Sequence, residues 1–535
     1  MLYNHPLNGK IFIYLYLLTG GLLGLLIALN WIGIIDDAYI FFRYAHNLSR
    51  GLGYTFNPGY PVEGTTSVSW TVLLSILDYF QIPLDIGAKF LGYLSILGCI
   101  FVLYFLFFRW SLSIAVVALI SVLLITNQQF TQSIMMGLET GLYALLLVAL
   151  LAATDNSLSN HFSANALGIV GVFLFLTRPE SVGILVLLTV GLIVFNPFNN
   201  PRISLIPVIW WLAGILLITL WRIGIFGDFI PNSARAKSVI SFLSLQWVII
   251  WPRLLSSSIY LVDWFQSSWF LILAGIGGLG YVWQRNRFQG FTALSILLLG
   301  CGVVLLNAGD WMPFSRLLTP YLPPLVAMAG LAIHKTILLC REDWRPRLGW
   351  LLISLSALIY ISTLWQLRNN DIFTATIWPT EICYKKVGII LQSQFSKNTL
   401  LAPEAIGAIG YQLPEVPILD MFGLTEPFIA RNGVIPKAAY TFGKHNYEYV
   451  LGQNPAIFLF HSDVVNHIPY LNKWGYSQDY STFQLDDGNC QLVVGIRNSY
   501  LPGWVNALEQ AFRIQPFDTS SLPRSFEATW PLGEK

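Results

Sequence analysis

Two adjacent acidic residues, Asp36 and Asp37, follow the first hydrophobic segment of the chain. They begin a stretch that is predicted to be helical as far as about Arg50, because carboxylates are favoured by the free amide groups and the dipole at a helix start. One acid would be sufficient for this stabilising role. Two neighbouring carboxylates raise each other's pKa, which is the property that a general base needs. We therefore interpret the pair as catalytic, with a helix cap as the alternative.

The predicted helix carries further side chains that suit a sugar substrate. Asp37 lies on the same predicted side as Phe41 and Tyr44, which favours it as a base beside a stacked sugar ring. Asp36 is expected to pair toward Arg43. The substrate-binding residues predicted from this helix and the loop after it are Arg43, Tyr44, His46 and Glu63.

Short polar segments between later hydrophobic runs hold the other candidates. Glu139, in MMGLETGLYALL, is interpreted as a third catalytic acid, with a helix start as the alternative. Arg178, in RPE, is expected to bind a phosphate or one of these acids. The remaining predicted substrate-binding residues are Asn232 and Lys237 in FGDFIPNSARAK, Asp310, Trp311 and Arg316 in NAGDWMPFSRLLTPYLPP, and His445 in GKH. Ordinary loop roles are the alternative for each of them.

The composition places these residues in a membrane protein. Of the 535 residues, 55% are hydrophobic and only 11% are charged, whereas a soluble domain carries about 25% charged residues. The net charge of +2 gives no indication of nucleic-acid binding. The chain lacks CxxC, HExxH and Gly-rich phosphate-loop motifs, so zinc and nucleotide sites have no support. The need for another divalent metal is left open.

The hydrophobic runs predict eleven transmembrane helices, since a span needs about 20 apolar residues. Residues 66–82 are also apolar, but Trp70, Asp78 and several hydroxyl groups favour a helix that lies along the membrane surface. The predicted spans are 11–34, 85–108, 111–127, 140–154, 164–178, 181–196, 203–224, 266–283, 290–307, 317–339 and 348–367.

The distribution of basic residues orients these spans, because cytoplasmic loops are enriched in Lys and Arg. One set of loops contains Lys10, Arg109, Arg202, Arg285, Arg287, His334, Lys335, Arg341, Arg345 and Arg347, and is predicted to be cytoplasmic. The opposite set contains Asp36, Asp37, Glu63, Glu139, Arg178, Glu180, Asp228, Lys237, Asp310 and Arg316. The N-terminus is therefore predicted inside, the C-terminus outside, and the reactive groups on the outer face of the cytoplasmic membrane.

The composition becomes more polar after about residue 368. We predict a transmembrane domain over 1–367, with an outer loop at 35–84, and an extracytoplasmic α/β domain over 368–535. In that domain we expect a helix at 380–395 and strands at 398–402, 416–420, 456–461, 480–485 and 490–496. Its two cysteines, Cys383 and Cys490, form either a disulfide or two free thiols.

Four segments resemble the GT-C membrane glycosyltransferases, in particular the mycobacterial terminal β-(1→2)-arabinofuranosyltransferases. They are DDAYIFFRYAHNLSRGLGYTFNPGYPVEGTTS, PNSARAK, GDWMPFSRLLTP and DMFGLTEPFIAR, and the resemblance covers most of the chain. It implies transfer of a sugar, which is arabinofuranose in the group named, from a polyprenyl phosphate to a cell-envelope glycan or lipid acceptor outside the membrane. By position, Asp36 and Asp37 correspond to the catalytic acids of the first outer loop, and Glu139 resembles the acid of the second.

The residue types agree with such a reaction. A lipid phosphate is already a good leaving group, so the reaction needs cations that stabilise its developing charge rather than a general acid. The acceptor hydroxyl needs a base, and one carboxylate on the opposite face of the sugar gives an inverting displacement.

Two other functions remain open from the sequence. A transporter or flippase of lipid-linked sugars would place ionisable groups inside its spans, whereas these spans are nearly free of charge. A non-catalytic receptor or assembly factor would use the outer domain as a binding module.

Overall fold

The chain divides into two compact units. A computed structural model describes residues 9–29, 33–155, 161–237, 247–307, 309–310, 312–369, 379–395, 399–434, 443–461 and 467–517. Unit 1 comprises Met1–Ile32, Ala88–Thr219 and Leu255–Ala375, and unit 2 comprises Gly33–Gly87, Leu220–Leu254 and Thr376–Lys535. The last segment of unit 2 begins at Thr376, and the domain division predicted at 367/368 stays a prediction. The predicted outer loop, however, groups with the C-terminal residues rather than with the hydrophobic segments.

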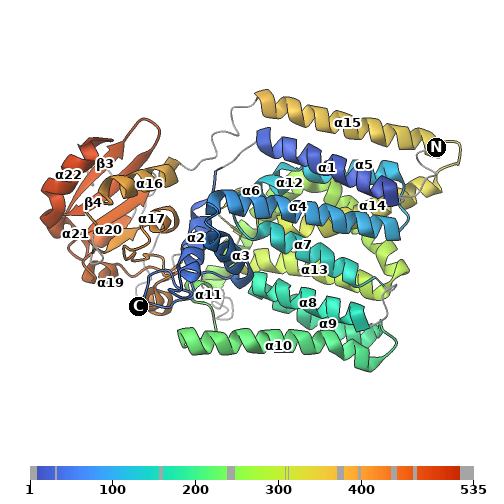
Figure 1. Ribbon diagram of the computed structural model, residues 1–535, viewed down its shortest axis with the longest axis horizontal. Coiled ribbons are helices and arrows are strands. Elements are labelled where there is room, and N and C mark those ends of the chain that lie inside the picture. The colour runs from blue at the N-terminus through green and yellow to red at the C-terminus, as the bar shows by residue number, and fades with distance from the viewer. Residues whose placement is uncertain are drawn as a thin grey trace. The chain divides into compact units, whose positions relative to one another are not determined.

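Every predicted span overlaps a helix, and Figure 1 shows the helices of unit 1 running side by side. The helices are α1 (Gly9–Leu29), α4 (Leu84–Arg109), α5 (Ile114–Ile125), α7 (Thr140–Ala153), α8 (His161–Thr177), α9 (Val182–Phe195), α10 (Pro201–Phe226), α12 (Trp247–Arg285), α13 (Arg287–Asn307), α14 (Leu322–Leu339) and α15 (Arg345–Asn369). The 3-10 turns η2 (Pro179–Ser181) and η4 (Thr319–Tyr321) precede α9 and α14.

These helices differ in length from the prediction. Within the described residues, seven helices are long and apolar enough to cross a membrane, and α5 forms a further bent pair with α6 (Gln128–Met135), at an angle of 52°. The other predicted spans are shorter, with 14 residues in α7 and α9 and 17 in α8. Helix α12 has 39 residues and starts well before its predicted span.

The outward faces of the long helices are apolar. Leu217 of α10 is 67% exposed and Trp365 of α15 is 68% exposed. A soluble protein rarely exposes such an apolar surface. Helices can place this surface in lipid, because all their backbone groups are hydrogen-bonded within the helix. The chain is a multi-pass membrane protein with an additional α/β part.

Polar contacts link loops that were predicted to be cytoplasmic. Arg109 lies 3.9 Å from Asp155, and Arg285 donates to the carbonyl of Arg109 at 3.2 Å. Asn286 donates to the carbonyl of Thr154 at 2.9 Å. The ends of α4, α7 and α12 therefore meet at one end of unit 1, as the predicted alternation of loops requires.

The stretch predicted to lie along the membrane forms α3 (Val68–Tyr79). Its 12 residues extend over about 18 Å, too short to span a bilayer. One side packs on α2 (Asp36–Ser49), and the other exposes Ile76, Tyr79 and Phe80 at 48%, 72% and 68%. The helix is therefore amphipathic, and its position along the membrane surface stays a prediction.

Unit 2 contains a five-stranded sheet in the order β1-β2-β4-β3-β5. The strands are β1 (Leu401–Pro403), β2 (Ile457–His461), β3 (Tyr480–Asp486), β4 (Gln491–Arg497) and β5 (Arg513–Pro516). The pair β1–β2 is parallel and the other pairs are antiparallel. The helices of this part are α11 (Asn232–Ala236), α16 (Pro379–Leu391), α17 (Gly407–Gln412), α18 (Pro427–Asn432), α19 (Tyr447–Gly452), α20 (His467–Asn472), α21 (Tyr476–Asp479) and α22 (Leu501–Glu509).

Alternation along the strands gives the sheet two buried faces. Ile457 and Leu459 of β2 pack in a core with residues of α16, α17 and α22. Phe458 and Phe460 point to the other face, toward α19, α20 and α21. Successive side chains of a strand point to opposite sides, so one continuous apolar run fills both cores. Figure 1 shows the sheet with helices beside it.

Cys383 and Cys490 are bonded in a disulfide, with their Cα atoms 5.9 Å apart. The bridge joins α16 to the turn before β4 across 107 residues. Closing a loop of this size in the unfolded chain contributes about 4–5 kcal/mol in the chain-entropy model. We therefore expect unreduced peptide mapping to recover the cross-linked pair, and reduction to lower the thermal midpoint. Two free thiols in protein isolated without reductant would reject the bridge.

Candidate active site

Asp36 is held by the C-terminal part of unit 2. It is 6% exposed, and its two carboxylate oxygens accept hydrogen bonds from the amides of Gly407 at 2.8 Å and Ala408 at 2.7 Å. These residues begin α17, so Asp36 satisfies amides at the start of a helix distant in sequence. A side chain at Gly407 has no room, because its Cβ would lie 1.9 Å from the carbonyl oxygen of Asp36. Both carboxylate oxygens of Asp36 therefore bind backbone amides of the C-terminal part.

Asp37 occupies the first turn of α2 and is only partly buried. Beside it in the chain, Tyr39 receives a hydrogen bond from the ammonium of Lys385, which also lies 4.1 Å from the Tyr39 ring centroid. Lys385 comes from α16. A cation of the C-terminal part therefore contacts Tyr39, in the first turn of α2. The partial exposure of Asp37 distinguishes it from Asp36.

Arg43 is fully buried and bound by neutral oxygen atoms. It donates to the carbonyls of Phe56 at 2.7 Å, Gly410 at 2.9 Å and Val416 at 2.9 Å. Burial lowers the pKa of Arg43 to about 9. The predicted pairing with Asp36 is wrong, because the C-terminal segment supplies carbonyl partners instead. The Arg43 guanidinium connects α2 to that segment, and this contact does not support its predicted role as a substrate ligand.

Phe41 and Tyr44 do not form the expected sugar-stacking face. Phe41 is 7% exposed and Tyr44 is 0% exposed. The Tyr44 hydroxyl donates to the carbonyl of Val62 and accepts from the amide of Gly64, the latter at 2.8 Å. Tyr44 belongs to the same core as the inner face of the sheet. Its burial removes the reason that favoured it as a substrate ligand.

His46 pairs with a carboxylate of the neighbouring helix. Its Nδ1 lies 3.2 Å from Asp78 of α3, and the His46 side chain is 23% exposed. The Ser49 hydroxyl donates to the same carboxylate. His46 thus lies at the end of α2 away from Asp36 and Asp37, where it joins α2 to α3.

Glu63 forms a buried ion pair with Arg222, near the end of α10. The guanidinium Nε lies 2.8 Å from one oxygen and Nη2 lies 2.9 Å from the other. The two side chains are 2% and 6% exposed. Burial raises the pKa of Glu63, although its bonds to Arg222 oppose this shift. Arg222 was not among the predicted residues, because a single Arg near the end of an apolar run resembles a membrane-interface residue.

Asn232 and Lys237 flank the short helix α11 and have different environments. Asn232 is 9% exposed and donates to the carbonyls of Gly423 and Leu424 at 2.8 and 2.9 Å, so it joins two loops. Lys237 is partly exposed, and its ammonium makes no ion pair with any residue that the structure describes. The predicted role of Lys237 as a ligand of an anionic group stays a prediction.

In unit 1, Glu139 and Arg178 form an ion pair with a distance of 3.0 Å. Both side chains are almost completely buried, and Glu180 lies 3.6 Å from the same guanidinium with 32% exposure. The guanidinium also lies 5.2 Å from the Tyr143 ring centroid. A phosphate or an acid was expected as the partner of Arg178, and in this structure the partner is an acid. Glu139 is the buried counter-ion of Arg178.

A second ion pair of unit 1 joins Arg316 to Asp310 at 2.6 Å. The turn before Arg316 is unusual, because Phe314 and Ser315 have φ angles of 64° and 45°. Non-glycine residues in this region are strained, and such strain is often found at functional sites. The predicted ligand Trp311 lies outside the described residues.

Tyr260 of α12 interacts with residues of both ion pairs, Glu139–Arg178 and Asp310–Arg316. Its hydroxyl accepts a hydrogen bond from the amide of Leu317 at 3.0 Å, and it interacts electrostatically with Asp310, Arg316 and Arg178. Asp263, one turn further along α12, accepts from Ser315 at 3.1 Å. Sequence reasoning missed both α12 residues, although an acid just before an apolar run is a visible signal. One end of unit 1 thus holds two buried arginines with their acids.

His445 is buried in unit 2, at 6% exposure, among aromatic rings. Its ring centroid lies 4.8 Å from that of Phe422 and 5.6 Å from that of Tyr447, to which it is parallel. This packing supports a structural role. Among the residues with described positions, no group of three or more His, Cys, Asp and Glu side chains could hold a metal ion.

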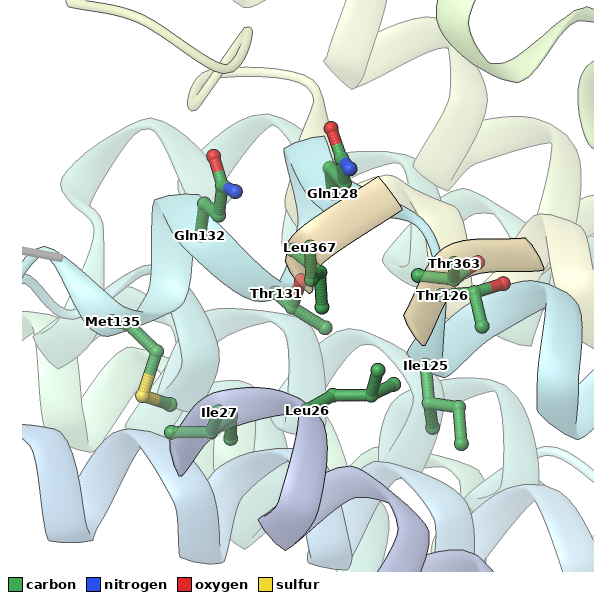
Figure 2. Close-up of a pocket in the computed structure, with 10 residues that line it drawn as sticks. All are labelled: Leu26, Ile27, Ile125, Thr126, Gln128, Thr131, Gln132, Met135, Thr363 and Leu367. Atoms are coloured by element: carbon green, nitrogen blue, oxygen red, sulfur yellow. The ribbon is translucent and has the colours of Figure 1, made fainter. Parts of the chain in front are cut away.

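A small pocket lies in unit 1 between α1, the bend from α5 to α6, and α15 (Figure 2). Its volume is about 20 Å³, with Leu26 and Met135 in its wall. The hydroxyls of Thr126 and Thr131 there donate to carbonyls four residues earlier in the chain. A space of this size holds about one water molecule. It is too small for a sugar ring.

Known proteins resemble the chain in structure rather than in sequence. No curated protein sequence matches it, and residues 374–500 match a family described as a domain of unknown function (DUF8728). The archaeal oligosaccharyltransferase AglB from Archaeoglobus fulgidus superimposes with a TM-score of 0.51 and 13% identity, covering 92% of this chain and 75% of AglB. ArnT from Cupriavidus metallidurans gives 0.50 and 10%, covering 91% and 97%. The arabinofuranosyltransferase AftD from Mycobacteria gives 0.47 and 11%, covering 93% and 40%. The chain has the fold of AglB and ArnT, which is the GT-C fold.

Proposed function

We propose that the protein is an inverting glycosyltransferase that takes a sugar from a polyprenyl phosphate and passes it to a cell-envelope glycan or lipid outside the cytoplasmic membrane. The observation that carries the proposal is the GT-C fold over 92% of the chain, shared with AglB. That structure of AglB is a complex with an inhibitory peptide and a dolichol-phosphate. Arabinofuranose is the first sugar to test, because the sequence resemblance favours it.

Asp37 is proposed as the general base. Asp36 is occupied by two amides, whereas Asp37 is partly exposed in the same helical turn. In the proposed step the acceptor oxygen forms a bond to the anomeric carbon while the bond from that carbon to the phosphate oxygen breaks. The acceptor proton passes to Asp37, and the electron pair leaves with the polyprenyl phosphate. A single displacement of this kind inverts the anomeric configuration.

The cations Lys237, Arg316 and Arg178 are proposed to stabilise the phosphate charge. Lys237 has no acid partner within the described part of the chain. Arg316 and Arg178 are paired with Asp310 and Glu139, which hold the guanidinium groups in place. Asp310 and Glu139 are thus proposed as positioning residues rather than as bases.

Removal of Arg316 is expected to weaken donor binding about 10- to 100-fold, because a charge-assisted bond to phosphate is lost. Arg316→Lys should recover only part of the affinity, since lysine lacks the planar pair of donors. The measurement is titration of purified protein in nanodiscs with a polyprenyl-phosphate sugar. Arg109→Ala, which removes an arginine paired with Asp155 elsewhere in unit 1, is the matched control. Unchanged donor affinity in Arg316→Ala would remove this residue from the site.

The orientation in the membrane is tested with reporters. A reporter fused after residue 367 is expected to be active only outside the cytoplasm, and one inserted within 284–289 only inside, because the basic loops are cytoplasmic. The disulfide between Cys383 and Cys490 supports this orientation, since such bonds persist in oxidising compartments. Two opposite results would contradict the predicted topology.

The reaction itself is tested with labelled donors. Purified protein is incubated with polyprenyl phosphates that carry radiolabelled arabinose, mannose, glucose or galactose, with and without an envelope fraction. The proposal predicts release of polyprenyl phosphate that depends on the acceptor, for at least one donor. Movement of an intact donor across vesicles without cleavage would indicate a flippase.

A further inference from the structure

An exposed group of aromatic rings in unit 2 is not used by the proposed chemistry. Phe428 of α18 and Tyr449 of α19 are stacked, with ring centroids 4.2 Å apart and an angle of 19° between the planes. Phe428 is 43% exposed, and Tyr60 of the first loop is 48% exposed. The phenol of Tyr60 interacts electrostatically with that of Tyr449. We call Tyr60, Phe428 and Tyr449 the aromatic platform.

The backbone around the platform is fixed by side-chain hydrogen bonds. Glu426 accepts from the amide of Phe428 at 3.1 Å and so caps α18. Asn446 accepts from the amide of Tyr449 at 3.0 Å and caps α19. Tyr60 ends a turn whose Asn57 exchanges two bonds with the backbone of Ile418, at 2.8 and 3.0 Å. The three rings therefore lie on segments whose backbone is already fixed. This lowers the conformational entropy that would be lost when a ligand binds.

Polar groups suited to hydroxyl recognition surround the platform. The Tyr449 phenol interacts electrostatically with Glu426, which is itself 9% exposed. Arg431, 54% exposed in its side chain, pairs with Asp228 at 3.4 Å. Tyr60 interacts electrostatically with both Glu426 and Arg431. Asp228 also pairs with Arg235 at 2.7 Å. Two acids and two cations are therefore present here, with carboxylate oxygens as acceptors and guanidinium N–H groups as donors.

We propose that the aromatic platform, with Glu426 and Arg431 at its rim, binds an uncharged saccharide of the acceptor glycan. Aromatic rings offer flat apolar faces to the C–H side of a sugar ring, and the rim offers donors and acceptors to its hydroxyl groups. The balanced charge favours a neutral ligand over an anionic one. A lipid surface is disfavoured, because the carboxylates of Glu426 and Asp228 would meet anionic headgroups. The identification of this saccharide as the acceptor rests on the proposed function. Saccharide binding by the platform does not depend on it.

The test measures binding without turnover. Full-length protein in nanodiscs is titrated by calorimetry with defined arabinan, galactan, mannan and glucan oligosaccharides. Wild type is expected to bind at least one of them, and Phe428→Ala to weaken that binding about tenfold by removing one stacking face. Phe428→Tyr keeps a ring and should retain affinity. Trp474→Ala removes another exposed aromatic side chain of unit 2, at 55% exposure, and should leave binding unchanged.

Three results of the binding measurement would each overturn the proposal. They are no binding of any oligosaccharide by wild type at millimolar concentration, wild-type affinity in Phe428→Ala, and equal losses in Phe428→Ala and Trp474→Ala. A label at Phe428→Cys that is quenched by spin-labelled lipid, without saccharide binding, would assign the rings to membrane contact. Saccharide binding without sugar transfer would leave this inference standing and reject the proposed function. Sugar transfer with an unchanged acceptor KM in Phe428→Ala would support the proposed function and reject this inference.

Discussion

Asp37→Asn is expected to lower the rate of sugar transfer by about 100- to 10,000-fold, the usual effect of losing a general base. Asparagine keeps the size of the side chain but cannot accept the acceptor proton. Donor affinity and expression should stay near wild type, because α2 retains a polar residue in its first turn. The measurement is kcat for transfer, together with donor titration of the same preparation.

Asp36→Asn is the matched comparison, and its effect should differ in kind. The Asp36 carboxylate accepts from two amides, whereas an asparagine has only one acceptor oxygen and a donor in place of the other. We therefore expect lower thermal stability together with a smaller loss of rate. Near-normal turnover in both variants would end the catalytic interpretation of the pair. Activity lost only in Asp36→Asn would reverse the assignment of the base.

Breaking the Glu63–Arg222 pair is expected to destabilise the protein by about 3–5 kcal/mol, because either single change leaves a buried charge unpaired. Glu63→Gln should lower the thermal midpoint strongly in the same detergent. A double change of both residues to methionine should recover much of the loss, since a buried pair is often replaceable by apolar side chains.

The control for this pair is one on the surface. Arg341 and Asp343 are 82% and 58% exposed, so Arg341→Gln should change stability by less than about 0.5 kcal/mol. If Glu63→Gln melts at the wild-type temperature, the pair does not hold the first loop to the end of α10. Glu63 would then return to the set of proposed substrate ligands.

The helices of the membrane part were predictable because runs of about 20 mostly apolar residues are typical of membrane-spanning helices and rare in soluble proteins. The break between α5 and α6 was missed, although its signal is in the sequence. Asn127 accepts from the amide of Phe130 at 2.9 Å and caps α6. The extra length of α12 was missed because Asp263 interrupts the apolar run that defined the predicted span.

In the C-terminal part, alternating or continuous apolar runs predicted β2, β3 and β4 close to their observed bounds. The short β5 was missed because Arg513, Gln515 and Pro516 give it little apolar character, which is common in an edge strand. The expected strand at 416–420 contributes only a bridge between Leu401 and Ile418. It runs beside β1 without extending the sheet.

The candidate site was predictable as a set of residues but not as a set of contacts. Arg43 and Asp36 bind backbone groups 367 and 371 residues further along the chain, at Gly410 and Gly407. Helical spacing shows which side chains share a face of α2, but not which segment covers that face. For the same reason Tyr44 was expected to meet a sugar and instead lies in a core. The pairing of Arg178 was predictable, because a buried arginine requires a partner.

The most direct test of the account is the fate of a labelled sugar on a polyprenyl phosphate. Wild-type protein in nanodiscs, given the donor and an envelope acceptor, is predicted to form a glycosidic product whose anomeric configuration by NMR is opposite to that of the donor. Asp37→Asn, with the same donor affinity, is predicted to form almost none. Folded wild-type protein that binds the donor but transfers no sugar from any member of the panel, or a product with retained configuration, would contradict the account.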